Sequence, residues 1–280
     1  MTGPAVPDLP APPGEDADVP GFLAALGVPG IVDVHVHFLP ESVLRKVWAY
    51  FDGAAENYGM AWPVHYRLPE PERVATLRDL GVGGFAPLVY PHRPGMARWL
   101  TEWVTGFAAA TPGAVPTATL FPEPDVADYL GAAVAAGARV VVHCGHGPLR
   151  GAHTGLDVFA EVLAAHPRLP VVLAHAGLPD YGAALDLVAA HPHCHLDTTM
   201  VGTAFTEAFA PLPPDWTARL ADVADRVVFG SDFPNIPYAY AEQVRAVAGW
   251  AAADDRLGPE FLRSVLHDAP ARLLGLPVTP

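Results

Sequence analysis

Short apolar runs alternate with amphipathic segments along most of the chain. Runs rich in β-branched residues predict buried strands, because these residues favour an extended backbone. They cover 31–38, 82–90, 115–121, 139–144, 169–175, 193–199 and 226–232. The segments between them carry apolar residues at helical spacing and predict helices. We expect these helices over 41–51, 69–81, 95–113, 125–138, 155–167, 181–192, 216–225, 240–252 and 258–275.

The alternation of strand and helix predicts an α/β fold in which helices cover a parallel sheet. The strands read as nearly continuous apolar runs, as expected when both faces of a sheet are buried. A TIM (β/α)8-type barrel takes roughly 250 residues, so the 280 residues of this chain fit one such barrel. We place the barrel domain at 29–280, after a loose, proline-rich N-terminal tail over 1–28 that ends in a short helix.

The strand count falls one short of a complete barrel. Between the runs 115–121 and 139–144 there is room for one helix only, so the fourth strand and its helix have no clear counterpart. Three alternatives follow. The barrel lacks this βα unit, or the short segment PVHYRL at 63–68 supplies the strand, or the N-terminal tail fills the gap.

The composition indicates which partners the protein can bind and in which cellular compartment it is expected. The formal net charge of −14 argues against nucleic acid, because phosphate binding requires clustered lysine and arginine. Only 16% of the residues are charged, which is compatible with the buried contacts of a homo-oligomer. The start of the chain does not read as a signal peptide, no apolar run is long enough for a membrane span, and two cysteines are too few for a disulfide framework. We therefore expect a cytoplasmic protein that acts on a small molecule.

Polar side chains end several of the apolar runs. His35 and His37 close the first run, and His143, His175 and Asp232 close three later ones. In a parallel barrel these ends meet at one rim, where the active sites of this fold are built. A single histidine at a strand end is more often a hydrogen-bonded core residue, but several buried polar groups without partners would be destabilising. A shared divalent metal satisfies them together, since imidazole and carboxylate are common metal ligands.

Five motifs, taken in order, resemble those of the amidohydrolase superfamily. They are VDVHVHFLPE at 32–41, VVVHCG at 140–145, PVVLAHAG at 170–177, VVFGSDFPN at 227–235 and VLHDAPARLLGL at 265–276. The similarity is greatest to the amidohydrolase-related branch, which includes aminocarboxymuconate-semialdehyde decarboxylase and dicarboxylate lactonases. The resemblance implies a TIM barrel whose metal ligands are His35 and His37 from the first strand, His143 from the fifth and Asp232 from the eighth. It also implies that His175, from the sixth strand, contacts the substrate or the attacking water.

The lysine content bears on the number of metal ions. Binuclear members of the superfamily bridge two metals with a carboxylated lysine or a glutamate. Lys46 is the only lysine of the chain, and it follows the first strand rather than the fourth. We therefore expect one divalent metal ion, with Zn²⁺ as the first choice and Mn²⁺ or Fe²⁺ as alternatives.

Further polar residues lie on segments that follow the strands at the same rim. The candidates for substrate binding are Arg150, His146, His153, Asn235, His92 and Arg93. Arg150 is suited to a substrate carboxylate, because a guanidinium binds a carboxylate through two parallel hydrogen bonds. The alternative for this residue is a solvated loop arginine.

These residues favour metal-dependent hydrolysis of a small ester, lactone or amide that bears a carboxylate. The metal would activate a water, Asp232 would take up its proton and return it to the leaving group, and His175 would stabilise the oxyanion. The alternative is non-oxidative decarboxylation, in which Asp232 or His175 protonates the carbon that loses CO₂. A degenerate barrel that binds a ligand without turnover is the second alternative.

Overall fold

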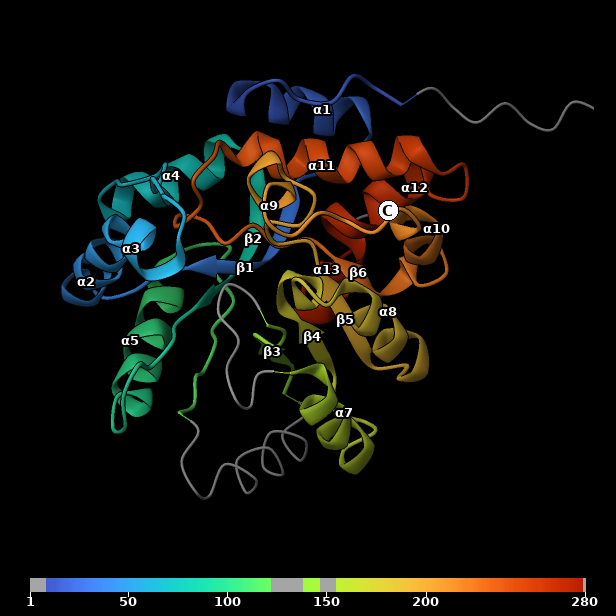
Figure 1. Ribbon diagram of the computed structural model, residues 1–280. Coiled ribbons are helices and arrows are strands. Elements are labelled where there is room, and N and C mark those ends of the chain that lie inside the picture. The colour runs from blue at the N-terminus through green and yellow to red at the C-terminus, as the bar shows by residue number, and fades with distance from the viewer. Residues whose placement is uncertain (1–8, 122–137, 147–154, 279–280) are drawn as a thin grey trace, which may run out of the picture.

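The computed structural model describes residues 9–121, 138–146 and 155–278 (Figure 1). The strands are β1 (Ile31–His37), β2 (Val82–Leu88), β3 (Val140–Val142), β4 (Val171–Leu173), β5 (Cys194–Asp197) and β6 (Val227–Val228). The longer helices are α2 (Glu41–Asp52), α4 (Glu70–Asp79), α5 (Ala97–Ala110), α7 (Leu156–Ala165), α8 (Tyr181–Ala190) and α11 (Tyr240–Ala253). The shorter ones are α1 (Val19–Ala25), α3 (Ala54–Tyr58), α9 (Ala204–Glu207), α10 (Trp216–Ala221), α12 (Gly258–Arg263) and α13 (Ala269–Leu274). Within the described residues, none of the helices has the length and apolar character that crossing a membrane requires.

The six strands form one parallel arc. β2 pairs with β1, and β3, β4, β5 and β6 pair with one another in that order. The segment after β6 joins the two groups, because the amide of Val34 donates to the carbonyl of Phe229 at 2.9 Å. The parallel direction brings the carboxyl ends of all strands to one rim, as the alternation of strands and helices predicted.

Between Asp33 and Val36, β1 contains one extra residue relative to β2. Asp33 pairs with Phe85 and Val36 pairs with Pro87, so three steps along β1 match two steps along β2. Such a β-bulge breaks the regular alternation of strand faces. Bulges of this kind are frequent beside active sites, where they redirect a side chain.

The bulge separates Asp33 from the two histidines that follow it. Asp33 accepts a hydrogen bond from the hydroxyl of Tyr240 on α11 at 2.9 Å. A regular strand would place His35 and His37 on this same face, toward the helix. With the extra residue in between, both imidazoles instead reach Asp232 at the rim of the barrel.

A small apolar cluster fills the interior of the barrel. Val34, Val172 and Val228 from three strands contact Ala269 and Leu273 of α13. The same two residues of α13 line a cavity with Arg139 and Pro170, which lie at the amino ends of β3 and β4. Helix α13 therefore closes the end of the barrel opposite the rim.

The segment 39–70 covers the barrel and does not contribute a strand. It contains α2 and α3, and residues 63–68 form no strand, so the alternative in which PVHYRL completes the sheet is wrong. Its backbone is used elsewhere, because the amide of His65 donates to the carbonyl of Ile236 at 2.8 Å. The indole of Trp62 likewise donates to the carbonyl of Asn235 at 2.7 Å. These bonds fix the segment over the loop that follows β6.

The N-terminal segment packs on the barrel. Helix α1 buries Phe22 in the main core, and Figure 1 shows this helix alongside α11. The guanidinium of Arg245 on α11 donates to the carbonyl of Pro13 at 2.9 Å. The expectation of a loose tail therefore does not hold for residues 9–28, and this part of the chain does not fill the gap in the sheet.

No strand of the described residues takes the place of the fourth barrel strand. The run 115–121 forms no regular strand, and only Gly113 and Val115 exchange backbone hydrogen bonds with Phe85 of β2, at 2.9 and 2.8 Å. In the part of the chain that the structure describes, β3 has β4 as its one strand neighbour. Accordingly, β3 is half-buried, whereas β4 is fully buried. The helix expected over 125–138 lies outside the described residues, apart from its last residue.

Candidate metal centre

Three ligand atoms from β1 and the segment after β6 form a tight triangle. Nε2 of His37 lies 2.7 Å from Oδ1 of Asp232, and Nε2 of His35 lies 3.5 Å from the same oxygen. The two Nε2 atoms are 3.3 Å apart. Ligands bonded at about 2.1 Å to one ion lie roughly 3.0 to 3.4 Å from each other at octahedral or tetrahedral angles. The observed separations bracket this range, so the three atoms fit a common metal ion.

The hydrogen bonds of the two imidazoles leave both Nε2 atoms as acceptors. Nδ1 of His37 lies 3.2 Å from the carbonyl of Leu88, which can only accept, so this nitrogen carries a proton. Nδ1 of His35 donates in the same way to Oδ2 of Asp197 at 2.9 Å. In the neutral rings each Nε2 then presents a lone pair to another acceptor. Without a metal, a second proton on a ring removes this conflict, because Nε2 of that ring then donates a hydrogen bond. A metal ion between the rings takes the place of that proton, and the donor set therefore suits a metal.

The carboxylates around His35 give the centre a preference for positive charge. Burial lowers the pKa of His35, but the charge and hydrogen bond of Asp197, together with the charge of Asp232, raise it to about 9. Burial raises the pKa of Asp232, yet the hydrogen bond from His37 and the charges of the imidazoles hold it well below its usual range. The negative charges of Asp197 and Asp232, which retain a proton on His35, also attract a metal cation.

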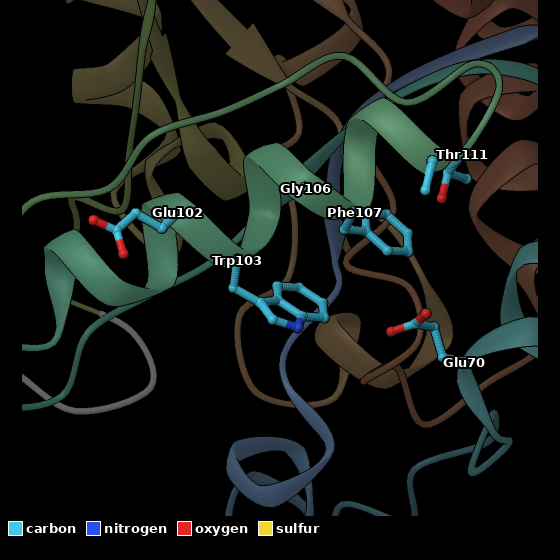
Figure 2. Close-up of a pocket in the computed structure, with 7 residues that line it drawn as sticks. Glu70, Glu102, Trp103, Gly106, Phe107 and Thr111 are labelled. Atoms are coloured by element: carbon cyan, nitrogen blue, oxygen red, sulfur yellow. The ribbon is translucent and has the colours of Figure 1, made fainter.

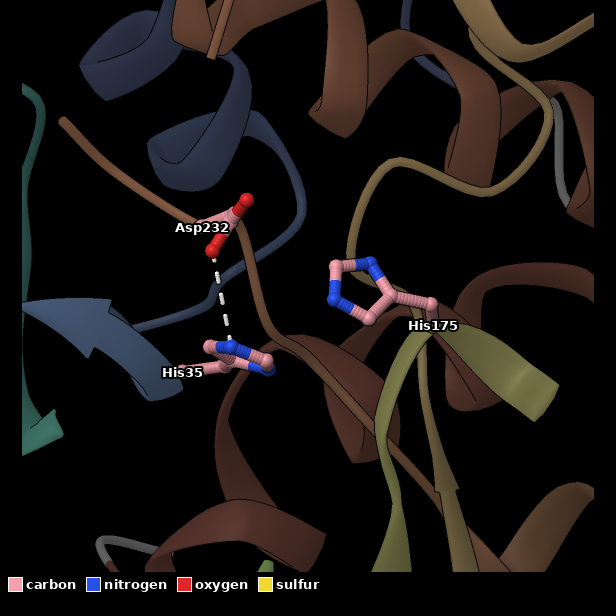
Figure 3. A group of neighbouring side chains, drawn as sticks. All are labelled: His35, His175 and Asp232. Atoms are coloured by element: carbon pink, nitrogen blue, oxygen red, sulfur yellow. Dashed lines mark ion pairs between the residues drawn. The ribbon is translucent and has the colours of Figure 1, made fainter. Parts of the chain in front are cut away.

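His175 closes the site from the end of β4. Its ligand atom and those of His35 and Asp232 all lie within 4.8 Å of one another, and Figure 3 shows the three side chains converging. Its Nδ1 is buried and has no hydrogen-bond partner within the described residues. Burial, with the nearby His143, lowers the pKa of His175 to about 3. A neutral imidazole with an unpartnered nitrogen is suited to hold a water or a substrate oxygen.

The backbone is strained where it carries these side chains. His175 and Asp232 have φ angles of 55° and 69°, a region that residues other than glycine seldom occupy. Gly230 lies two residues before Asp232, and a Cβ at this position would be 2.9 Å from Cβ of His35 and nearer still to Oγ1 of Thr199. Strained backbone of this kind gathers at functional sites, where the surrounding structure holds it in place.

His143 follows β3 and contacts the site through His175. The ring centroids of His143 and His175 are 4.8 Å apart, and His175 in turn lies 5.1 Å from His35. His143 is exposed, whereas His35, His37 and Asp232 are buried. The structure therefore brings three of the four predicted ligands into one group and places His143 beside His175 at the exposed side of that group.

Asp197 is a residue of the centre that the sequence analysis did not single out. Besides binding His35, its carboxylate accepts hydrogen bonds from the backbone amides of His175 at 2.7 Å and Thr199 at 3.1 Å. The signal was present, because Asp197 ends the strand in HCHLDTT as Asp232 follows the last strand.

Tyr90 is the second residue that the sequence analysis missed. Its ring meets the edge of His37, with centroids 5.1 Å apart, on the segment that follows β2. Burial raises the pKa of its hydroxyl, and the charge of Asp232 raises it further. The available sequence signal is an aromatic residue at the end of the apolar run 82–90, two and three positions before His92 and Arg93.

The candidate substrate residues differ in their surroundings. Asn235 is buried, and its side-chain oxygen accepts a hydrogen bond from the indole of Trp48 at 3.1 Å, so it anchors α2 near the rim. His146 is half-buried and binds Asp180 through Nδ1 at 2.7 Å. His92 and Arg93 are exposed, while Arg150 and His153 lie outside the described residues.

A separate cavity lies between α5 and the start of α4. Its volume is about 390 Å³, and its lining includes Glu70, Glu102, Trp103 and Phe107 (Figure 2). The rings of Trp103 and Phe107 stack with an interplanar angle of 11°. None of the lining residues belongs to the metal centre, so this cavity is not the site of the chemistry described above.

Comparisons with known proteins identify the family. A family model described as Amidohydrolase matches residues 124–276, which is more than half of the chain. No curated protein matches the chain.

Solved structures of similar shape cover nearly the whole chain. An uncharacterized TIM-barrel protein from Bordetella bronchiseptica has a TM-score of 0.58 at 14% identity, over 88% of this chain and 98% of that one. For 5-carboxyvanillate decarboxylase from Novosphingobium aromaticivorans, in complex with manganese, the TM-score is 0.59 at 14% identity, over 90% and 97%. For 4-oxalomesaconate hydratase from Rhodopseudomonas palustris it is 0.50 at 15% identity, over 88% and 95%. At these identities the likeness concerns the fold alone. The chain is thus a TIM barrel, and it belongs to the amidohydrolase family.

Proposed function

We propose that this protein is a metal-dependent hydrolase of a small ester, lactone or amide that bears a carboxylate. The observation that carries the proposal is the triangle formed by Nε2 of His35, Nε2 of His37 and Oδ1 of Asp232. These residues, with His143, would hold one divalent metal ion, and Zn²⁺ suits a set of imidazoles and one carboxylate. The manganese in the 5-carboxyvanillate decarboxylase structure supports Mn²⁺ as the alternative.

The residues around the metal have distinct tasks in hydrolysis. A divalent ion at this site would lower the pKa of a water and polarise the substrate carbonyl. Asp232 contributes Oδ1 to the triangle, and its other oxygen accepts the proton of the attacking water and passes it to the leaving group. His175, whose Nδ1 lacks a partner within the described residues, hydrogen-bonds the water or the developing oxyanion.

The outer part of the site supports a small, carboxylate-bearing substrate. Arg93 is exposed on the segment after β2, and a guanidinium there suits a substrate carboxylate. Tyr90 contributes an aromatic surface beside His37. Arg150 is the other candidate partner of the carboxylate.

Non-oxidative decarboxylation is the second candidate reaction. It is supported by the likeness in fold to 5-carboxyvanillate decarboxylase, and the same ligands serve both reactions. In that reaction the substrate oxygens would bind the metal directly, and Asp232 or His175 would protonate the carbon that loses CO₂. The first-strand pair His35 and His37, in place of a glutamate and a histidine, favours hydrolysis.

The experiment combines metal analysis with an isotope test. Purified protein is analysed for bound metal and assayed against panels of lactones, esters, amides and aromatic acids in H₂¹⁸O. Hydrolysis predicts about one metal per chain and ¹⁸O in the product, without CO₂. Release of CO₂ without ¹⁸O incorporation would replace hydrolysis by decarboxylation. Absence of metal, or unchanged metal content and activity in His35→Ala, would overturn both enzyme proposals.

A further inference from the structure

We propose that Asp197 is the positioning residue that decides which nitrogen of His35 carries the proton, and so keeps Nε2 free for the metal, and that an amide at position 197 inverts this choice. The proposal rests on the proposed metal centre. It goes beyond it because it assigns a task to a side chain that touches no substrate.

The two oxygens of Asp197 have different partners. Oδ1 accepts the backbone amide of His175 at 2.7 Å and the backbone amide of Thr199 at 3.1 Å. Oδ2 accepts the Nδ1 proton of His35 at 2.9 Å. The carboxylate is completely buried, so no solvent can take over any of these bonds.

Backbone donors determine how an amide would sit in this place. An asparagine side chain has one acceptor end and one donor end. The acceptor end must face the amides of His175 and Thr199, because two N–H groups cannot point at a buried NH₂ group without losing their hydrogen bonds. The NH₂ group then occupies the position of Oδ2 and faces Nδ1 of His35.

This arrangement moves the proton of His35 to the wrong nitrogen. An NH₂ group that faces Nδ1 makes Nδ1 an acceptor, so the neutral ring carries its proton on Nε2. Nε2 is the atom that lies 3.3 Å from Nε2 of His37, within the ligand triangle. A protonated nitrogen has no lone pair to offer a metal ion, and the triangle loses one of its three atoms.

His37 is protected from such an inversion. Its Nδ1 donates to the backbone carbonyl of Leu88, a group that no side-chain substitution changes from acceptor to donor. A backbone carbonyl thus fixes the proton on Nδ1 of His37, whereas a side-chain carboxylate fixes the proton on Nδ1 of His35. Only the proton position of His35 can therefore be changed by a substitution of its hydrogen-bond partner.

The comparison of two variants separates this role from simple structural support. If Asp197 only filled space and satisfied backbone amides, the isosteric Asp197→Asn would be milder than Asp197→Ala. The proposed role predicts the opposite order for metal affinity. In Asp197→Ala no side chain at position 197 fixes the proton of His35. The metal can then bind the tautomer of His35 in which Nε2 is unprotonated.

The test measures Zn²⁺ affinity by chelator competition in stripped and reloaded full-length protein. We expect the affinity to fall on the order of 100-fold in Asp197→Asn and on the order of 10-fold in Asp197→Ala. Asp180→Asn is the matched control, because this carboxylate also binds a histidine, His146, at 2.7 Å, but outside the centre. It should leave the affinity for Zn²⁺ unchanged. Wild-type affinity in Asp197→Asn, or a weaker affinity in Asp197→Ala than in Asp197→Asn, overturns the proposal.

A second measurement covers the case in which the alanine variant does not fold. In metal-free, ¹⁵N-histidine-labelled Asp197→Asn, NMR identifies the nitrogen of His35 that carries the proton. The proposal predicts Nε2, and a proton on Nδ1 overturns it. If the wild type binds no metal, the proposed function fails, whereas the proton position in the variant still decides the role of Asp197.

Discussion

The Nε2 atoms of His35 and His37 face each other at 3.3 Å, although each ring already donates its Nδ1 proton to another acceptor. Two lone pairs at this distance repel unless a second ring proton or a metal cation lies between them. The carboxylate of Asp232 adds a third acceptor within 3.5 Å of both.

Metal removal should destabilise the protein reversibly. A ligand that binds only the folded state at 100 times its dissociation constant adds about 2.7 kcal/mol to the free energy of unfolding. We expect a chelator to lower the melting temperature and added Zn²⁺ to restore it, as measured by scanning calorimetry. His37→Ala should show no such shift. An equal shift in the variant would place the stabilising ion elsewhere.

A methyl group at position 230 should disturb both the fold and the metal centre. In Gly230→Ala the new Cβ would lie 2.9 Å from Cβ of His35, within a closely packed wall of the barrel. Overpacking of this kind lowers the free energy of unfolding by about 1 to 3 kcal/mol, which urea denaturation measures. The affinity for Zn²⁺ should fall as well, since the clash pushes on a ligand.

Gly249→Ala is the matched control for that substitution. Gly249 lies within α11, and a Cβ there meets no atom within 4 Å. Because alanine favours a helix more than glycine does, this variant should gain up to about 1 kcal/mol. A loss of stability at 249 similar to that at 230 would contradict the steric explanation.

Anchoring of the segment over the rim should depend on Asn235. Asn235→Ala removes the acceptor of the Trp48 indole at 3.1 Å and leaves a half-buried donor without a partner. We expect a loss of about 1 to 3 kcal/mol in the free energy of unfolding and a change in the fluorescence of Trp48. Asn57→Ala, which removes an exposed bond to the carbonyl of Tyr50, should change neither quantity. Unaltered stability in Asn235→Ala would show that this bond does not hold the segment.

The two cysteines should be unreactive in the folded protein. Burial raises the pKa of the Cys144 and Cys194 thiols from 9.0 to about 12. At pH 8 a thiol reagent should therefore modify neither residue until a denaturant is added. The pKa is lower in the unfolded chain, so the unfolded state loses its thiol protons first and stability should fall as the pH rises from 9 toward 12. Rapid modification of either thiol at pH 8 without denaturant would contradict the buried placement.

The sequence predicted correctly those features that follow from the pattern of neighbouring residues. The apolar runs at 31–38 and 169–175 gave strands, and the polar residues that end them, His35 and His175, lie in one site. The common rim follows from the parallel direction alone, so it needed no knowledge of distant contacts. The family followed from the order of the same motifs.

Features that depend on contacts between residues far apart in the sequence could not be predicted from local patterns. The bulge in β1 is visible only against β2, yet it determines that His35 faces Asp232 and not α11. PVHYRL has the composition of a short strand, but its backbone bonds to the loop after β6 are specified by the loop and not by its own residues. Asp197 required the knowledge that its neighbour across the barrel is His35, which is 162 positions away in the chain.

The most direct test of the metal centre is anomalous scattering from crystals of the zinc-loaded protein, with data collected on both sides of the zinc absorption edge. The account predicts one strong peak about 2.0 to 2.2 Å from Nε2 of His35, Nε2 of His37 and Oδ1 of Asp232. A map without a peak among these three atoms, or with the zinc ion bound to other residues, would contradict it.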